Sequence, residues 1–224
     1  MKRESLPVNA NRKAPSLELV LFDFGGVLAE EGFRNGLFAI AEKNALDAQR
    51  FFIYACEAIV ETGYLTGRAD EKTFWELLRS RFSLQSPDSA LRNEILTHFT
   101  LRAWMIDHVK RLRGAQVHTA LLSDQTNWLK ELDAGQHFFS LFDRVFNSYD
   151  EHKSKLDPTL FDDVLHCMHT APDKALFIDD NEGHIGRARQ RGLHAIVYRD
   201  REDFELHMAE FFPLLAVPCP GDEP

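Results

Sequence analysis

Little cysteine and no long apolar run are the first features of this 224-residue sequence. Cys56, Cys167 and Cys219 are far apart and form no Cys-x-x-Cys pair, which favours reduced structural thiols over a disulfide framework. No apolar stretch approaches the roughly 20 residues that span a bilayer, and the polar residues 1–16 lack the apolar segment of a secretory signal. We therefore expect a cytoplasmic protein without a membrane partner.

Positive charge is also scarce, because 26 lysines and arginines stand against 35 acidic residues and the net charge is −9. Nucleic-acid grooves require clustered Lys and Arg, so we expect no nucleic-acid partner. An acidic protein still binds phosphate esters where a metal ion and a few local donors supply positive charge. No pattern in the sequence indicates an oligomeric state.

Short apolar segments rich in branched residues recur along the chain and predict strands that are buried on both faces. They span 19–22, 117–122, 175–178 and 195–198, with a weaker candidate at 144–147. Helical patterns lie between them, at 104–113, 127–134, 158–169 and 184–191. This alternation predicts an α/β fold, a doubly wound parallel sheet with helices on both faces.

The interval after the first strand breaks this rhythm, because it contains helical patterns and no convincing strand. The helical patterns span 37–43, 48–61, 70–81 and 89–99, and Asp70 fits a helix N-cap. We therefore expect an all-helical domain inserted into an α/β core. The expected division is a core of 17–30 and 101–216, a helical insertion of 31–100, a flexible leader of 1–16 and a flexible tail of 217–224.

Polar side chains follow three of the predicted strands, where the carboxyl ends of parallel strands meet and ligands bind. Asp23 follows the first, Ser123 the second, and the pair Asp179 and Asp180 the segment 175–178. Each could cap a helix instead, but three neighbouring carboxylates repel one another unless a cation intervenes. Oxygen ligands without histidine or cysteine favour Mg²⁺ over zinc.

Two further features accompany these carboxylates. Gly25 and Gly26 after the first strand allow a sharp turn, a carbonyl ligand for a metal or N–H groups for phosphate, although a plain tight turn explains them equally well. Lys153 and Lys155 precede Pro158 at the start of a predicted helix. A lysine that neutralises phosphate charge is a common requirement of phosphoryl transfer.

In this order, these residues resemble the haloacid dehalogenase superfamily of hydrolases, most of whose members are phosphatases. Four motifs carry the resemblance, and the segments around Gly67-Arg68 and Phe74-Trp75 resemble the family's helical cap. The motifs are Asp23 with Gly26-Val27-Leu28, Ser123, Lys155-Leu156-Asp157-Pro158, and Asp179-Asp180. The resemblance covers about 17–212 and implies a Rossmann-like core with a cap domain. The nearest subgroup has an Asp-x-Gly first motif and includes phosphatases of glucose 1-phosphate.

The resemblance implies a Mg²⁺-dependent phosphatase of a small phosphorylated metabolite, with a sugar phosphate among the candidates. Asp23 would attack phosphorus and form an aspartyl-phosphate. Ser123 would hydrogen-bond a phosphate oxygen, and Lys155, preferred to Lys153 for its spacing to Asp157-Pro158, would neutralise the developing charge.

The resemblance also implies a ligand set for the metal. Mg²⁺ would be bound by Asp23, the carbonyl of Gly25 and Asp180, with Asp179 as a ligand or as a partner of the ligands. Substrate contacts are expected from three residues, which are Gly26, Asp124 and Arg34. In the cap, Tyr64 and Arg68 are further candidates.

Two positions depart from the family pattern. Phosphatases of this family usually carry a second Asp two residues after the nucleophile as the general acid and base, but this chain has Gly25 there. Such assistance is typically worth ~10²–10⁴-fold in rate. Asp124 stands where the family usually has Asn, and the sequence alone gives no reason for this acid.

These departures leave two alternatives open. The glycine at position 25 is compatible with a catalytically weak phosphate-binding or regulatory protein. A metal-independent 2-haloacid dehalogenase also lacks the second Asp, but the intact Asp179-Asp180 pair favours Mg²⁺. His152 and His184 lie near the motifs, and we expect both to be surface or helix-end residues rather than site residues.

Overall fold

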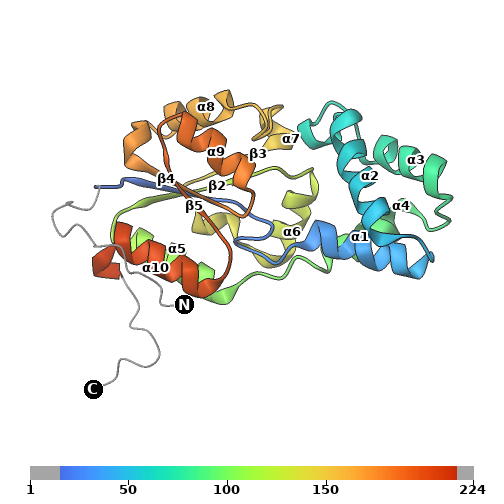
Figure 1. Ribbon diagram of the computed structural model, residues 1–224, viewed down its shortest axis with the longest axis horizontal. Helices are drawn as coiled ribbons and strands as arrows, with labels where there is room; N and C mark the ends of the chain where they lie inside the picture. Colours follow the sequence, from blue (N-terminus) through green and yellow to red (C-terminus); the bar gives the residue numbers. More distant parts are fainter. Residues whose placement is uncertain (1–15, 216–224) are drawn as a thin grey trace, which may run out of the picture.

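The computed structural model describes residues 16–215, in which five strands form one parallel sheet (Figure 1). The strands are β1 (Leu19–Phe22), β2 (His118–Ser123), β3 (Arg144–Asn147), β4 (Ala175–Asp179) and β5 (His194–Val197). Their spatial order is β3-β2-β1-β4-β5, and all five predicted strands are confirmed within one residue. The expected tail and all but one residue of the expected leader lie outside the described residues.

Both faces of the sheet are covered by helices, which explains the continuous apolar runs of the strands. Leu19 and Leu21 of β1 pack with α8 (Thr159–Cys167) and α9 (Glu182–Gln190). Val20 and Phe22 belong to the opposite core, which includes side chains of α5 (Ala103–Gly114), α6 (Trp128–Gln136) and α10 (Arg201–Phe211). Figure 1 shows α8 and α9 on one side of the sheet and α5 and α10 on the other. The doubly wound α/β fold is therefore confirmed.

Several shorter elements are also present. They are α7 (Ser148–Glu151) and the 3-10 turns Tyr64–Thr66, Phe139–Leu141, Pro172–Lys174 and Pro213–Leu215.

The sequence patterns did not predict α10. Its buried face consists of Phe204 and Met208, and the charged residues between them leave too weak a helical apolar stripe to recognise.

Four helices lie between β1 and α5, beside one end of the sheet (Figure 1). They are α1 (Gly32–Lys43), α2 (Ala48–Glu61), α3 (Glu71–Phe82) and α4 (Asp88–Leu96), and we call residues 31–99, which contain them, the helical block. The Asp70 side chain caps α3 by accepting a hydrogen bond from Thr73 N at 2.9 Å, as predicted. The division of the chain into a core domain and a cap domain stays a prediction.

Helix α1 begins five residues earlier than its predicted start. Gly32 and Gly36 lower the helical propensity of this turn, but close packing requires them. A Cβ on Gly36 would overlap the backbone of Ile95 in α4, and one on Gly32 would overlap the Phe99 ring. The glycines therefore permit the tight contact between α1 and α4.

Aromatic packing fixes the helical block against the α/β layer. Trp75 of α3 stacks on Trp128 of α6 with ring centroids 6.1 Å apart. Trp128 Nε1 donates to Glu71 Oε2 at 3.2 Å, and the buried Tyr64 hydroxyl donates to Asn127 Oδ1 at 2.6 Å. These contacts satisfy the polar tips of large buried rings and hold the block over the edge of the sheet.

Residues 16–215 contain no helix with both the length and the apolar character needed to cross a membrane.

Replacing Gly36 tests the close packing of α1 on α4. Gly36→Ala should lower the free energy of unfolding by about 1–3 kcal/mol, because the new methyl group meets the backbone Cα of Ile95, which cannot rotate away. Gly186→Ala in α9 is the matched control, since open space surrounds that position, and it should stabilise by about 0.5–1 kcal/mol. Urea unfolding followed by circular dichroism measures both. Similar changes for the two variants would contradict this packing argument.

Candidate active site

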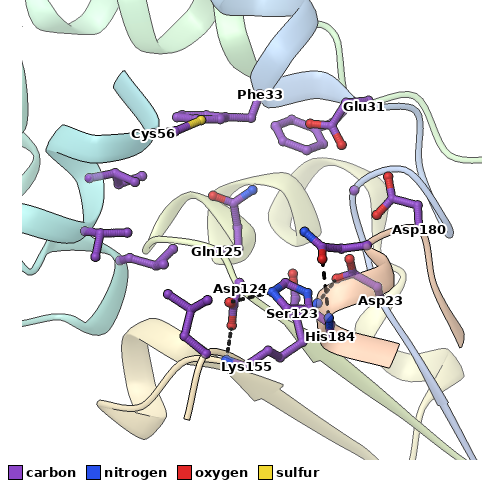
Figure 2. A pocket seen from close by; sticks show the side chains of 17 residues that line it. Asp23, Glu31, Phe33, Cys56, Ser123, Asp124, Gln125, Lys155, Asp180 and His184 are labelled. Atoms are coloured by element: carbon purple, nitrogen blue, oxygen red, sulfur yellow. Dashed lines mark hydrogen bonds and ion pairs between the residues drawn. The ribbon is translucent and has the colours of Figure 1, made fainter. Parts of the chain in front are cut away.

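The parallel register brings the predicted polar residues to one edge of the sheet. Phe22 of β1 pairs with Leu121 of β2 and with Ile178 of β4. The next residue, Asp23, therefore lies between the ends of these strands, and its N–H donates to Ile178 O at 2.9 Å. Ser123 ends β2, and its side chain faces the same cavity (Figure 2).

Lys155 is the buried cation of this edge, with 1 % of its surface exposed. Its Nζ lies 2.8 Å from Asp23 Oδ1 and 2.6 Å from Asp179 Oδ2, so one ammonium group joins the ends of β1 and β4. The Lys155 backbone N–H donates to Asp124 Oδ1 at 2.9 Å. Lys153 points elsewhere, because its Nζ contacts Thr159 and Asp163.

The ionisation of the two bridged carboxyl groups is unequal. Burial opposes ionisation of Asp179, but the charge of Lys155 and the contact with His184 hold its pKa below the usual range. Burial raises the pKa of Asp23; Lys155 lowers it in turn, while Asp179 and Asp180 raise it further. A second cation beside Asp23 would therefore favour its ionised form.

Three carboxylates meet the requirements of an oxygen-ligand cation site. Asp23, Asp179 and Asp180 each offer an oxygen, and these atoms lie within 4.8 Å of one another. Gly26 has φ of +81°, and a Cβ there would overlap the Asp180 carboxylate. The absence of a side chain at Gly26 thus permits the approach of Asp180. Three acids beside one lysine fit a hard divalent cation such as Mg²⁺.

His184 lies at a helix end, as expected, but it also lines the cavity, which was not expected. It is in the first turn of α9, whose N-cap Asn181 accepts from the backbone N–H groups of Gly183 and His184. The ring Nδ1 is 3.3 Å from Asp179 Oδ2, and Nε2 is 3.9 Å from Asp124 Oδ2. The contacts of Asp124 with Lys155 and His184 give a structural reason for an acid at this position.

A cavity of about 370 Å³ lies between the edge of the sheet and the helical block (Figure 2). Its polar side is formed by residues from the α/β layer, which are Asp23, Gly25, Ser123, Asp124, Gln125, Lys155, Asp180, Asn181 and His184. The rest of its lining consists of Glu31, Phe33, Cys56, Ile59, Val60, Leu65, Phe99 and Leu156. Such a volume suits a small ligand.

Glu31 and Gln125 line the cavity but were not among the predicted site residues. Glu31 caps α1, with Oε1 accepting from Arg34 N at 3.4 Å, and burial followed by the charge of Asp180 raises its pKa. An acid just before a helix would have indicated an N-cap at Glu31. Because the helix was predicted to begin at residue 37, Glu31 was not recognised as one. Gln125 accepts from Thr126 N through Oε1, a loop contact with no sequence signature.

Several expected substrate contacts lie away from the cavity lining. The Arg34 guanidinium lies 5.2 Å from the Phe38 ring centroid. Tyr64 is buried among aromatic rings, Arg68 is exposed, and His152 Nδ1 lies 2.9 Å from Thr66 O. Gly26 also does not line the cavity, and its part in the structure is to make room for Asp180.

Removal of Lys155 should expose the repulsion among the carboxylates. Lys155→Met should lower the free energy of unfolding by about 3–5 kcal/mol at neutral pH, because two buried acids lose their cation. Without the lysine, the pKa values of Asp23 and Asp179 should be higher in the folded state of the variant than in its unfolded chain. The folded state then binds more protons, and the deficit should shrink as the pH falls from about 7 towards 4.

Lys153→Met is the matched control for this experiment. Lys153 pairs with the exposed Asp163, and such surface pairs contribute at most about 1 kcal/mol. Urea unfolding at several pH values, followed by circular dichroism, measures both variants. Equal losses for the two lysines, or a Lys155→Met deficit that does not depend on pH, would contradict the bridging role.

Comparison with known proteins agrees with this geometry. Residues 17–190 match the family of haloacid dehalogenase-like hydrolases. A D-ribitol-5-phosphate phosphatase of Bacteroides thetaiotaomicron is 24% identical over 191 residues, which cover 78% of this chain and 88% of that protein.

Solved structures share the fold. A HAD family enzyme of Bacteroides thetaiotaomicron in complex with magnesium and inorganic phosphate superimposes with a TM-score of 0.62 at 18% identity, over 82% of this chain and 94% of that one. An L-2-haloacid dehalogenase of Xanthobacter autotrophicus superimposes with a TM-score of 0.62 at 20% identity, over 89% and 86%. With the family match over well more than half of its length, the chain is a hydrolase that belongs to the haloacid dehalogenase-like family.

Proposed function

We propose that this protein is a Mg²⁺-dependent phosphatase that hydrolyses a small phosphate monoester through an aspartyl-phosphate on Asp23. The supporting observation is the convergence of Asp23, Ser123, Lys155 and Asp180 at one end of a cavity of ligand size. The names of the relatives agree with it, since one is a sugar-alcohol phosphate phosphatase and another binds magnesium with phosphate.

The surroundings of Asp23 suit a nucleophile. Its Oδ1 accepts from Phe24 N at 2.7 Å and lies 2.8 Å from Lys155 Nζ. These two donors fix the carboxylate and leave Oδ2 to attack phosphorus. The Ser123 hydroxyl would donate to a phosphate oxygen, and the Lys155 charge would offset the negative charge that develops there.

The metal site follows from the same contacts. Asp23, the Gly25 carbonyl and Asp180 are the proposed ligands of Mg²⁺, which when bound would neutralise charge on the phosphoryl group. Asp179 is already engaged, because Oδ2 contacts Lys155 and Oδ1 accepts from Asn181 N at 2.7 Å. We therefore assign Asp179 to orienting Lys155 and the strand end rather than to binding the metal.

Phosphate release with and without Mg²⁺ tests the proposal. Wild-type protein should release phosphate from p-nitrophenyl phosphate and from alkyl phosphates, and chelation of Mg²⁺ should abolish release. Asp23→Asn should lower turnover by a factor on the order of 10³ or more, because the nucleophile is lost. Asp70→Asn, a change at an exposed helix cap, is the matched control and should retain full activity.

Two other outcomes decide between the alternatives. Binding of Mg²⁺ and inorganic phosphate without turnover of any ester would replace the phosphatase with a binding or regulatory protein. Release of chloride from 2-chloropropionate without metal would instead identify a dehalogenase. Retained activity in Asp23→Asn would overturn the covalent intermediate.

A further inference from the structure

Gly25, two residues after Asp23, cannot supply an acid, but the carboxylate of Glu31 lies beside it. A Cβ built on Gly25 would lie 3.8 Å from Glu31 Oε2 and 3.4 Å from Phe99 Cε1. The carboxylate of Glu31 therefore occupies the neighbourhood of the side chain that Gly25 lacks. Figure 2 shows Glu31 on the same side of the cavity as Asp180.

The local structure holds Glu31 in this place. Its Oε1 caps α1 through Arg34 N, so Oε2 is the oxygen near Gly25. The following residue, Gly32, packs directly against the Phe99 ring, which fixes the turn that carries Glu31. Among the residues that the structure describes, no lysine, arginine or histidine forms an ion pair with Glu31, whereas its neighbour Glu30 pairs with Arg102 at 2.8 Å.

The other acids of the cavity are engaged elsewhere. Asp23 and Asp180 belong to the proposed nucleophile and metal site. Asp124 accepts from the Lys155 backbone and lies 3.9 Å from His184 Nε2. Within residues 16–215, Glu31 is thus the carboxyl group on the cavity wall that has no cationic partner and no place in those two sites.

We propose that Glu31 is the general acid and base of this active site and replaces the acid that Gly25 lacks, an inference that rests on the proposed phosphatase function. Asp23 Oδ2 forms a bond to phosphorus while the bond to the leaving oxygen breaks, and Glu31 gives its proton to that oxygen. Glu31 then takes a proton from water, whose oxygen bonds to phosphorus as the bond to Asp23 breaks. Phosphate leaves, and Asp23 and the protonated Glu31 are restored.

Leaving-group dependence tests this role. Glu31→Gln keeps the helix cap but cannot transfer the proton. Turnover of pentyl phosphate should fall ~10²–10⁴-fold, since an alkoxide needs protonation. The first turnover of p-nitrophenyl phosphate should change less than about tenfold, because p-nitrophenolate leaves unprotonated. Its steady state should slow, giving a burst of one p-nitrophenol per enzyme.

Two further variants sharpen the result. Glu30→Gln removes the adjacent acid, which is paired with Arg102 outside the cavity, and should leave both activities unchanged. Gly25→Asp in the Glu31→Gln background should restore pentyl phosphate turnover at least tenfold, because an acid returns to the same neighbourhood. Urea unfolding of each variant checks that the fold is retained.

The outcomes separate the two proposals. Two results with an active wild type would overturn the role of Glu31 while leaving the phosphatase intact. In one, Glu31→Gln keeps its activity on both substrates. In the other, its first turnover slows equally for both substrates. No gain from Gly25→Asp would overturn the equivalence of the two positions. A wild type without turnover of any ester would overturn the phosphatase and this inference with it.

A second inference concerns the leaving group and rests on the lining contributed by the helical block. The part of the cavity lining that the helical block contributes consists of Phe33, Cys56, Ile59, Val60, Leu65 and Phe99, with Glu31 as the charged exception. A polyol held there would bury hydroxyl groups without partners, which costs binding energy. The geometry points to a phosphate monoester of an apolar alcohol rather than the sugar phosphate that the family resemblance implies.

Pentyl phosphate and ribitol 5-phosphate form a matched pair, because both are five-carbon primary esters that differ in their hydroxyl groups. The wild type should show at least a tenfold higher kcat/KM for pentyl phosphate. Val60→Asn should reduce that value about tenfold, whereas Ile53→Asn should not, since Ile53 is equally exposed on α2 but does not line the cavity. A higher kcat/KM for ribitol 5-phosphate would overturn the inference and leave the phosphatase standing.

Discussion

The buried ammonium group of Lys155 is the interaction on which the site depends. It joins carboxylates at the ends of two neighbouring strands, at 2.8 Å from Asp23 and 2.6 Å from Asp179. Without it, three acids within 4.8 Å of one another would repel. The same residue anchors its own loop through Asp124. One cation therefore positions Asp23, the proposed nucleophile, together with the adjacent strand end and the loop before α8.

The edge of the sheet could be predicted because its geometry follows from strand polarity alone. Asp23, Ser123 and Asp179 each stand at the end of an apolar run, and parallel strands bring such ends together. The family resemblance, through the spacing to Asp157-Pro158, favoured Lys155 over Lys153, and Lys155 lies beside Asp23 in the structure. Apolar runs and the polar residues that follow them can be read directly from a sequence.

The contribution of the helical block could not be predicted in the same way. Glu31 enters the cavity because α1 begins at Gly32 and turns against Phe99, a contact between segments that are distant in sequence. Arg34 was expected at the substrate but lies over Phe38, since one residue along a helix changes direction by about a third of a turn. Apolar residues of the block also look alike in sequence whether they fill the core or line the cavity.

The residues of the site thus come from two parts of the molecule, the α/β layer and the helical block, which pack against each other. The ends of β1, β2 and β4 and the loop of Lys155 supply the groups that we propose bind phosphate and metal. The proposed acid and the apolar wall come from the helical block, whose place is fixed by the stacking of Trp75 on Trp128 and by the Tyr64 hydroxyl on Asn127. An acid at position 25 would be tied to the sheet, whereas Glu31 is tied to the block. Proton transfer by Glu31 therefore requires the block to be docked, and the same docking encloses the leaving group.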